Sequence, residues 1–291
     1  MGVKTLARIY GGNNVRVAIL DSGTPPPIFN NEGRVLSIYD HYDSEDDVYG
    51  HATAIGSILF GGDGIRGLCE RAEPVYIKVL DSKGIGSIKS VSNGILRAID
   101  EDCDVINLSL GFMRTEKCPK MLEKACERAC EAGKIIFCAS GNDGERVNWP
   151  AALKTTICVG ATDKNGAKTS FSSTGEVDFV AQGVNLPVFD IKGRLKTVSG
   201  TSFATALVSG VAALLVSRMK ASGINVTIER VREALQSRAK DIDEPGWDEN
   251  TGFGEISGEN GDAVCGMKID RGFLGKICAY LSHLKAKISK E

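Results

Sequence analysis

Residues 15–23 read VRVAILDSG, a nearly unbroken apolar run that ends in a small polar turn. A short run of β-branched and aliphatic residues with such an end is typical of a strand covered on both faces. Similar runs recur along the chain, and stretches with helical periodicity separate them. This alternation predicts an α/β fold of three layers, α/β/α, with helices on both faces of a mainly parallel central sheet.

The other apolar runs extend this pattern through most of the chain. They predict strands at 34–39, 75–80, 105–110, 135–139 and 156–159, and a hairpin formed by 188–191 and 195–198. Helices are expected at 52–59, 87–99, 118–131, 202–219 and 227–238. We expect one domain over residues 1–265, followed by a tail over 266–291. Apolar residues at helical spacing make this tail an amphipathic helix, which either docks on the domain or binds a partner or a membrane surface.

Composition narrows the class of protein. The chain has 291 residues, of which 42% are hydrophobic, and a net charge of −2, so nucleic acid is not an expected partner. No run is long enough to span a membrane, and 204–216 is interpreted as a buried helix. The N-terminus lacks the apolar segment of a secretory signal, which favours a cytoplasmic protein. Nine cysteines without tight metal-ligand spacing favour reduced, buried thiols, although Cys118, Cys126 and Cys130 leave a metal site as an alternative.

The chain has three histidines, His41, His51 and His283, among which a general base for neutral pH would be sought. His51 follows Gly50 and opens a helical stretch, so its side chain can project into a cleft at the edge of the sheet. Asp21 ends the first strand, and functional groups collect at such strand ends in open α/β sheets. Taken singly, a lone histidine or a turn aspartate is more often structural.

Two further segments combine small residues with polar side chains. Residues 200–206 read GTSFATA and lead into a long apolar helix, where Ser202 is either an ordinary N-cap or a nucleophile beside the helix N-terminus. Residues 139–144 read ASGNDG and close another strand. The amide of Asn142 could donate to a developing oxyanion there, whereas the same letters alone would indicate only a turn.

Together these segments resemble the motifs of the subtilisin-like serine proteases. The aspartate motif is similar to VAILDSG at 17–23, the histidine motif to GHAT at 50–53, the asparagine motif to ASGN at 139–142 and the serine motif to GTSFA at 200–204. The order aspartate, histidine, serine is also that of subtilisin. The resemblance extends over nearly the whole chain to about residue 264.

The resemblance implies a serine endopeptidase that cleaves polypeptides and requires no cofactor. Asp21, His51 and Ser202 would form the catalytic triad, and Asn142 would donate to the oxyanion. The substrate would bind as an extended strand between two segments, Gly84, Ile85, Gly86 and Ser109, Leu110, Gly111. The pocket beside the scissile bond would be walled by 109–111 together with Ala139, Ser140, Gly141 and Asp143. With Asp143 at the rim, a preference for basic side chains is an open alternative.

The chain also departs from the family pattern. Ala52, Ala54 and Ala206 replace the glycine, second histidine and proline that the motifs usually contain. Only twenty residues precede Asp21, which suits an intracellular type without a pro-segment. Structural calcium stays conceivable but unsupported, because residues 60–67 offer one carboxylate and the acidic run 43–47 is interpreted as a solvated loop.

Two alternatives to an active endopeptidase remain at this point. One is a pseudoprotease, in which the fold serves as a binding module; the intact set of catalytic groups argues against it, and the three alanine replacements keep it open. The other is a different acyl transfer on the same triad, such as ester hydrolysis or peptide ligation. A comparison of ester and amide substrates would separate these reactions.

Overall fold

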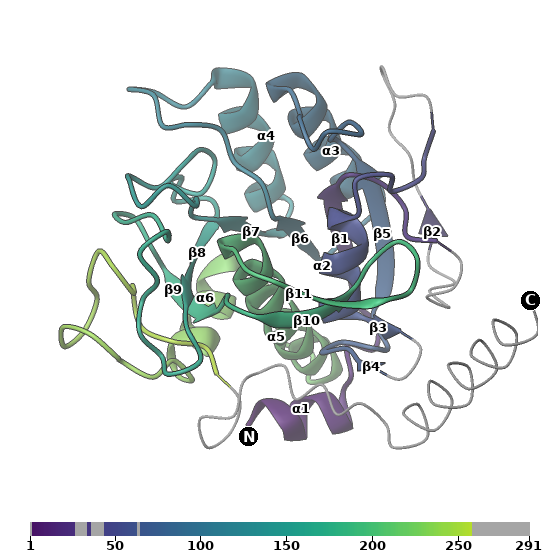
Figure 1. The fold of residues 1–291 in the computed structure, drawn as a ribbon. Coiled ribbons are helices and arrows are strands. Elements are labelled where there is room, and N and C mark those ends of the chain that lie inside the picture. Colours follow the sequence, from purple (N-terminus) through teal and green to yellow (C-terminus); the bar gives the residue numbers. More distant parts are fainter. Residues whose placement is uncertain (1, 27–33, 36–43, 63–64, 258–291) are drawn as a thin grey trace, which may run out of the picture.

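The computed structural model describes residues 2–26, 34–35, 44–62 and 65–257. Within them, a seven-stranded parallel sheet forms the centre of the molecule (Figure 1). Its strands are β1 (Arg16–Asp21), β2 (Arg34–Val35), β5 (Glu73–Lys78), β6 (Val105–Leu108), β7 (Ile135–Ala139), β8 (Ile157–Thr162) and β9 (Phe179–Gln182). Two short antiparallel pairs lie outside it: β3 (Gly61–Gly62) with β4 (Ile65–Arg66), and β10 (Leu186–Phe189) with β11 (Leu195–Val198).

Helices cover the sheet on both faces, as the sequence predicts. The helices are α1 (Val3–Ile9), α2 (His51–Leu59), α3 (Ile88–Asp100), α4 (Lys120–Glu131), α5 (Thr201–Ala221) and α6 (Ile228–Gln236). Figure 1 shows α3 and α4 on one side of the sheet and α2 and α5 on the other. Successive residues of a strand point to opposite faces. Accordingly, Val17 and Ile19 of β1 pack into the core beneath α2 and α5, whereas Ala18 and Leu20 pack with α3 and α4.

The strand order places the end of β1 at the middle of the sheet. The order is β2-β5-β1-β6-β7-β8-β9, so β1 has β5 on one side and β6 on the other. The chain therefore continues from β1 to a strand on one side and later crosses to the opposite side. A crevice forms at the carboxyl ends of strands at such a switch point, and ligands bind there in open α/β sheets. Asp21 is the last residue of β1.

The predicted elements are found with shifted ends, and some were missed. The sequence does not predict the first helix, α1, the last sheet strand, β9, or the short β3–β4 pair that follows α2. Of the strand expected at 34–39, the structure describes only Arg34–Val35. His41, His283 and the predicted tail over 266–291 lie outside the described residues.

Helix α5 is longer than the apolar segment suggested. It runs for 21 residues and, among the described helices, is the one long and apolar enough to cross a membrane. However, 94% of its most apolar window is buried inside the protein, so it is a core helix. The predicted burial of 204–216 is therefore confirmed, and the predicted length was too short.

Candidate active site

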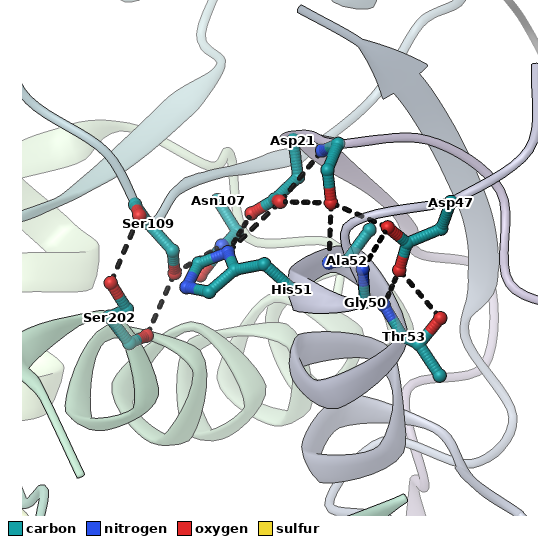
Figure 2. Close-up of polar contacts among 10 residues, drawn as sticks. Asp21, Asp47, Gly50, His51, Ala52, Thr53, Asn107, Ser109 and Ser202 are labelled. Atoms are coloured by element: carbon teal, nitrogen blue, oxygen red, sulfur yellow. Dashed lines mark hydrogen bonds and ion pairs between the residues drawn. The ribbon is translucent and has the colours of Figure 1, made fainter. Parts of the chain in front are cut away.

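Asp21 and His51 form a hydrogen-bonded pair at the end of β1. The Nδ1 atom of His51 lies 2.8 Å from Oδ2 and 2.9 Å from Oδ1 of Asp21. The carboxylate is fully buried, and the imidazole side chain is 19% exposed. Gly50, the N-cap of α2, has a φ of 86°, a left-handed conformation that glycine adopts without strain. This turn starts α2 so that its first residue, His51, faces Asp21 (Figure 2).

The surroundings raise the pKa of His51 above its ordinary value of 6.5. Burial acts in the opposite direction, because it disfavours the charged imidazolium. The charge and the hydrogen bond of Asp21 outweigh this effect, and the charge of Asp47 adds to them, whereas Lys196 on β11 opposes them. The imidazole is therefore a stronger base than an isolated histidine, and Asp21 holds the proton-bearing Nδ1.

Ser202 lies in the first turn of α5 and is joined by reciprocal hydrogen bonds to Ser109, the residue after β6. The Ser202 hydroxyl donates to the carbonyl oxygen of Ser109 at 3.0 Å, and the Ser109 hydroxyl donates to that of Ser202 at 2.8 Å. Behind them, Asn107 donates to the Ser109 hydroxyl at 2.9 Å and accepts from Ser209 of α5 at 3.1 Å. This buried network fixes the start of α5 against the end of β6.

The structure brings Ser202 beside His51 without joining them. In Figure 2 the imidazole of His51 lies between Asp21 and the turn of α5 that carries Ser202. The rings of His51 and Phe203 are 5.6 Å apart between centroids, which places the start of α5 against the imidazole. Among the hydrogen bonds of the described residues, none joins the Ser202 hydroxyl to His51, because that hydroxyl donates to Ser109 instead. Such catalytic hydrogen bonds are often absent or long before a substrate binds.

Asn142 follows β7 and is oriented by α5. Its Oδ1 accepts from the backbone N–H of Thr201 at 2.9 Å and from the Thr201 hydroxyl at 3.0 Å. Because the oxygen takes both donors, the Nδ2 group must point elsewhere and stays a donor. The first turn of α5 also presents backbone N–H groups, with positive potential from the helix dipole. Through Thr201, the residue before Ser202, the Asn142 side chain thus adjoins the first turn of α5.

The two segments expected to line a substrate differ in how much backbone they leave unpaired. Ile85 uses both backbone groups within the protein: its N–H donates to the Asp81 carboxylate at 2.8 Å and its C=O accepts from Asp81 at 2.9 Å. Gly84 also donates its N–H, to Asp81. In the described hydrogen bonds, the backbone groups of Gly86, Leu110 and Gly111 are not used. Ile85 is thus already paired within the protein, whereas substrate pairing along 84–86 stays a prediction.

The predicted pocket wall over Ala139, Ser140, Gly141 and Asp143 lies beside the start of α5. The Thr201 hydroxyl also lies 3.3 Å from the carbonyl oxygen of Gly141, although its one proton suits the shorter contact to Asn142, and this places the wall against the helix. The Asp143 carboxylate accepts from Ser173 at 2.8 Å, and this bond, followed by one from a backbone N–H, lowers the pKa of Asp143. Asp143 is therefore negatively charged at neutral pH. One of its carboxylate oxygens already accepts a hydrogen bond from Ser173.

One residue of the site was misjudged from the sequence. The acidic run 43–47 was interpreted as solvated, yet Asp47 is only 3% exposed. Its carboxylate accepts from Ser22, Gly50 and Thr53. Figure 2 shows Asp47, Gly50 and Thr53 on the side of the Asp21–His51 pair away from Ser202. The only signal in the sequence was that Asp47 lies four residues before His51. This spacing does not show that three separate residues donate hydrogen bonds to the Asp47 carboxylate.

The three departures from the family pattern are accommodated in the core. Ala52, Ala54 and Ala206 are each at most 1% exposed. The methyl group of Ala52 lies in the first turn of α2, whose backbone N–H at this residue donates to Ser22 at 3.0 Å. Among the described residues, no three histidine, cysteine or carboxylate side chains gather as metal ligands.

The fold and the site together define a class of protein. A basic histidine paired with a buried aspartate, beside a serine at a helix N-terminus and an oriented asparagine amide, is the group set of a serine hydrolase. Comparison with known sequences gives the family. A profile of the subtilase family matches residues 12–254, and the chain belongs to this family, as its motifs predicted.

Relatives of known sequence share about a third of the residues. The minor extracellular protease Epr of Bacillus subtilis is 34% identical over 84% of this chain, and a thermostable alkaline protease of Halalkalibacterium halodurans is 38% identical over 76%. The matches cover 38% and 62% of the length of these two relatives. Both are named as proteases.

Solved structures of proteases share the fold. A serine-to-alanine mutant of the protease domain of PatA superposes with a TM-score of 0.75 at 27% identity, over 84% of this chain and 92% of that domain. The prenylagaramide maturation protease PagA gives a TM-score of 0.77 at 27% identity, over 88% of this chain and 96% of its own. The three-layer α/β architecture predicted from the sequence is therefore confirmed.

Proposed function

We propose that this chain is a serine endopeptidase that uses Asp21, His51 and Ser202 as its catalytic triad. The observation that carries the proposal is the buried Asp21–His51 pair, with Nδ1 of His51 2.8 Å from the carboxylate, directly beside Ser202 at the start of α5. Membership of the subtilase family supports the same reaction class. These groups supply nucleophile, base and oxyanion donors, so the proposal includes no cofactor.

In this mechanism, the Ser202 hydroxyl leaves its hydrogen bond to Ser109 and turns toward Nε2 of His51. His51 takes the proton as Ser202 Oγ attacks the scissile carbonyl, and it gives that proton to the leaving amine, which leaves an acyl-enzyme. Water, deprotonated by His51, then breaks the acyl ester, releases the acid product and returns the proton to Ser202. Asp21 holds the ring tautomer and stabilises the imidazolium. The Nδ2 group of Asn142 and the backbone N–H of Ser202 donate to the oxyanion of the tetrahedral intermediate.

The substrate of this proposal is an extended polypeptide. The unpaired backbone groups of Gly86 on one side and of Leu110 and Gly111 on the other would bind its main chain. Side chains would then be selected by the wall over 139–143. The negative charge of Asp143 favours basic side chains at the pocket rim, and its bond to Ser173 weakens that preference.

A hydrolysis assay tests this function. The purified chain is incubated with a fluorogenic peptide library and with matched ester substrates, next to Ser202→Ala and Ser222→Ala variants. We expect cleavage of internal peptide bonds by the wild type and by Ser222→Ala, whose serine lies exposed at the other end of α5, and none by Ser202→Ala. Ester cleavage without peptide cleavage would favour the alternative acyl transfer. A folded wild type that cleaves neither would favour a binding module.

We further propose that the chain works in a reducing compartment such as the cytoplasm. All seven cysteines among the described residues are free thiols, six of them buried. Disulfides are frequent in proteins of oxidising compartments and rare in the cytosol. Alkylation of the nine cysteines in denaturant without reductant tests the redox part of this proposal.

A further inference from the structure

Asp47 is a buried carboxylate whose acceptor capacity is filled. Its Oδ1 accepts from the Ser22 hydroxyl at 2.7 Å and from the Gly50 N–H at 2.6 Å. Its Oδ2 accepts from the N–H of Thr53 at 2.7 Å and from the Thr53 hydroxyl at 2.6 Å. A carboxylate has about four acceptor positions, and here four donors use them. At 3% exposure, water does not compete for these bonds.

Two of these donors bracket His51 in the backbone. Gly50 is the N-cap of α2, but it has no side chain to satisfy the first-turn N–H groups. Asp47 does so from three residues upstream, since it accepts from the N–H groups of both Gly50 and Thr53. Its negative charge also suits a helix N-terminus. The backbone of His51 is thereby held between two anchored residues.

The third donor links Asp47 to Asp21. The Ser22 hydroxyl lies 2.7 Å from Asp47 and 3.0 Å from Oδ1 of Asp21, and it accepts from the Ala52 N–H at 3.0 Å. Its one proton suits the shorter contact, to Asp47. Lys78 of β5 reinforces this junction, because its buried ammonium donates to the carbonyl oxygens of Ser22 and Asp46, both at 2.8 Å.

We propose that Asp47 is a positioning residue for the reaction: it holds the start of α2 against the end of β1, and so sets His51 relative to Asp21 and Ser202. The inference rests on the proposed function. Asp47 has no contact with the segments 84–86 and 109–111 among the described hydrogen bonds. Its loss should therefore lower kcat and leave KM nearly unchanged.

Asp47 also contributes charge to the surroundings of His51. The charged groups that act on the imidazole are Asp21 of β1, Asp47 in the preceding loop and Lys196 of β11, with Lys78 of β5 behind Ser22. The two carboxylates favour the imidazolium and Lys196 disfavours it. Removal of the Asp47 charge should therefore lower the pKa of His51 and move the acid limb of kcat/KM to lower pH.

The test compares Asp47→Asn with Asp46→Asn in steady-state peptide hydrolysis across pH, with circular dichroism and thermal unfolding as checks on folding. Asp46 is exposed, and it accepts from Lys78 with its backbone carbonyl, not with its carboxylate. Asp46→Asn therefore removes the same charge as Asp47→Asn but leaves the hydrogen bonds of Asp47 intact. An asparagine at 47 keeps one acceptor oxygen and places an NH₂ group against an N–H. We expect kcat to fall about ten- to hundredfold in Asp47→Asn, while its KM stays close to the wild-type value. Both constants of Asp46→Asn should stay close to those of the wild type.

The acid limb of folded Asp47→Asn should also lie at lower pH than that of the wild type. Wild-type kcat and an unmoved acid limb, even with a lowered melting temperature, would overturn the inference. If Asp47→Asn does not fold, Ser22→Ala serves instead, because it keeps the Asp47 contacts to α2 and cuts the link to Asp21. A several-fold lower kcat is expected there, and an unchanged kcat would overturn the inference. A folded wild type that cleaves no peptide would instead contradict the proposed function.

Discussion

At the residue scale, the site depends on side chains that are oriented by neighbours outside the triad. Thr201 occupies the oxygen of Asn142 and so turns its amide nitrogen outward. Ser109 holds the Ser202 hydroxyl in the absence of substrate. Asp21 fixes Nδ1 of His51. The contacts to Asn142 and His51 leave Nδ2 and Nε2 unpaired in the described hydrogen bonds, whereas the Ser202 hydroxyl must leave Ser109 before it reacts.

The role of Asn142 can be tested by a pair of substitutions. Asn142→Ala removes an oxyanion donor and should lower kcat by about 10²–10³ with little change in KM; the magnitude is carried over from subtilisin, a relative in which such a loss is known. Thr201→Val removes only the hydroxyl that orients the amide and should cost a few-fold. Peptide hydrolysis kinetics measure both. A fall in affinity without a fall in kcat in Asn142→Ala would show that the amide binds substrate instead.

The raised pKa of His51 predicts the pH dependence of activity. The base must be neutral to accept a proton, so kcat/KM should rise with pH through a pKa above 6.5. Lys196 opposes the imidazolium, and Lys196→Ala should therefore move this limb to still higher pH. Because Lys196 is exposed, the shift should shrink as salt is added. A limb that moves to lower pH in Lys196→Ala would contradict this electrostatic description.

At the element scale, the start of α5 is the most constrained junction of the site. Its N-cap, Gly200, has φ 150° and ψ 158°, a region open essentially to glycine alone. A Cβ there would meet no atom closer than 3.6 Å, so the constraint comes from the backbone conformation and not from space. The conformation turns the chain from β11 into the helix and thereby places Ser202.

Substitution of this glycine should affect both stability and catalysis. Gly200→Ala should cost about 1–3 kcal/mol of unfolding free energy and reduce kcat, because relief of the strain would shift Ser202. Gly223→Ala is a matched control at the other end of α5, where φ is 66° and no atom lies within 4 Å of a Cβ. It should cost about 1 kcal/mol with unchanged kcat. Denaturant unfolding and peptide hydrolysis kinetics measure the two effects. Equal activities of the two variants would argue against the inference that the strained conformation of Gly200 positions Ser202.

The helices and strands were more fully predictable from the sequence than the contacts of the candidate site. Apolar runs such as that of β1 and the long apolar helix α5 stand out, because burial of a strand or helix on all sides leaves few polar positions. Strand β9 was missed because its four residues are too few to show the alternation of apolar and polar side chains that indicates a strand. Asp47 was misjudged because its donors, Ser22 and Thr53, come from separate segments that only the tertiary structure brings together. The hydrogen bond of Ser202 to Ser109 likewise depends on packing between α5 and β6.

At the scale of the whole molecule, buried thiols run through the core on the side of α3 and α4. Cys118, Cys126, Cys138 and Cys158 all pack in that part of the core. Burial raises the pKa of each, to about 11 for Cys118, and therefore disfavours the reactive thiolate. The fold thus protects these cysteines chemically without cross-linking them.

This protection predicts the reactivity of the intact protein. Native protein treated with iodoacetamide at pH 8, without reductant, should remain unmodified at these four positions by peptide mapping. In denaturant, again without reductant, all nine cysteines of the chain should be alkylated. An intact mass that shows fewer than nine additions would reveal disulfides and would contradict the proposed reducing compartment.

The most direct measurement on the proposed enzyme is covalent labelling by a fluorophosphonate probe, which reacts with an activated serine and needs no knowledge of the substrate. The folded wild type should be labelled on the peptide that contains Ser202, and Ser202→Ala should not be labelled. Labelling should also fall sharply in His51→Ala, because the hydroxyl then lacks its base. A folded wild type that resists the probe, or a Ser202→Ala variant labelled at the wild-type rate, would contradict the assignment of Ser202 as the nucleophile.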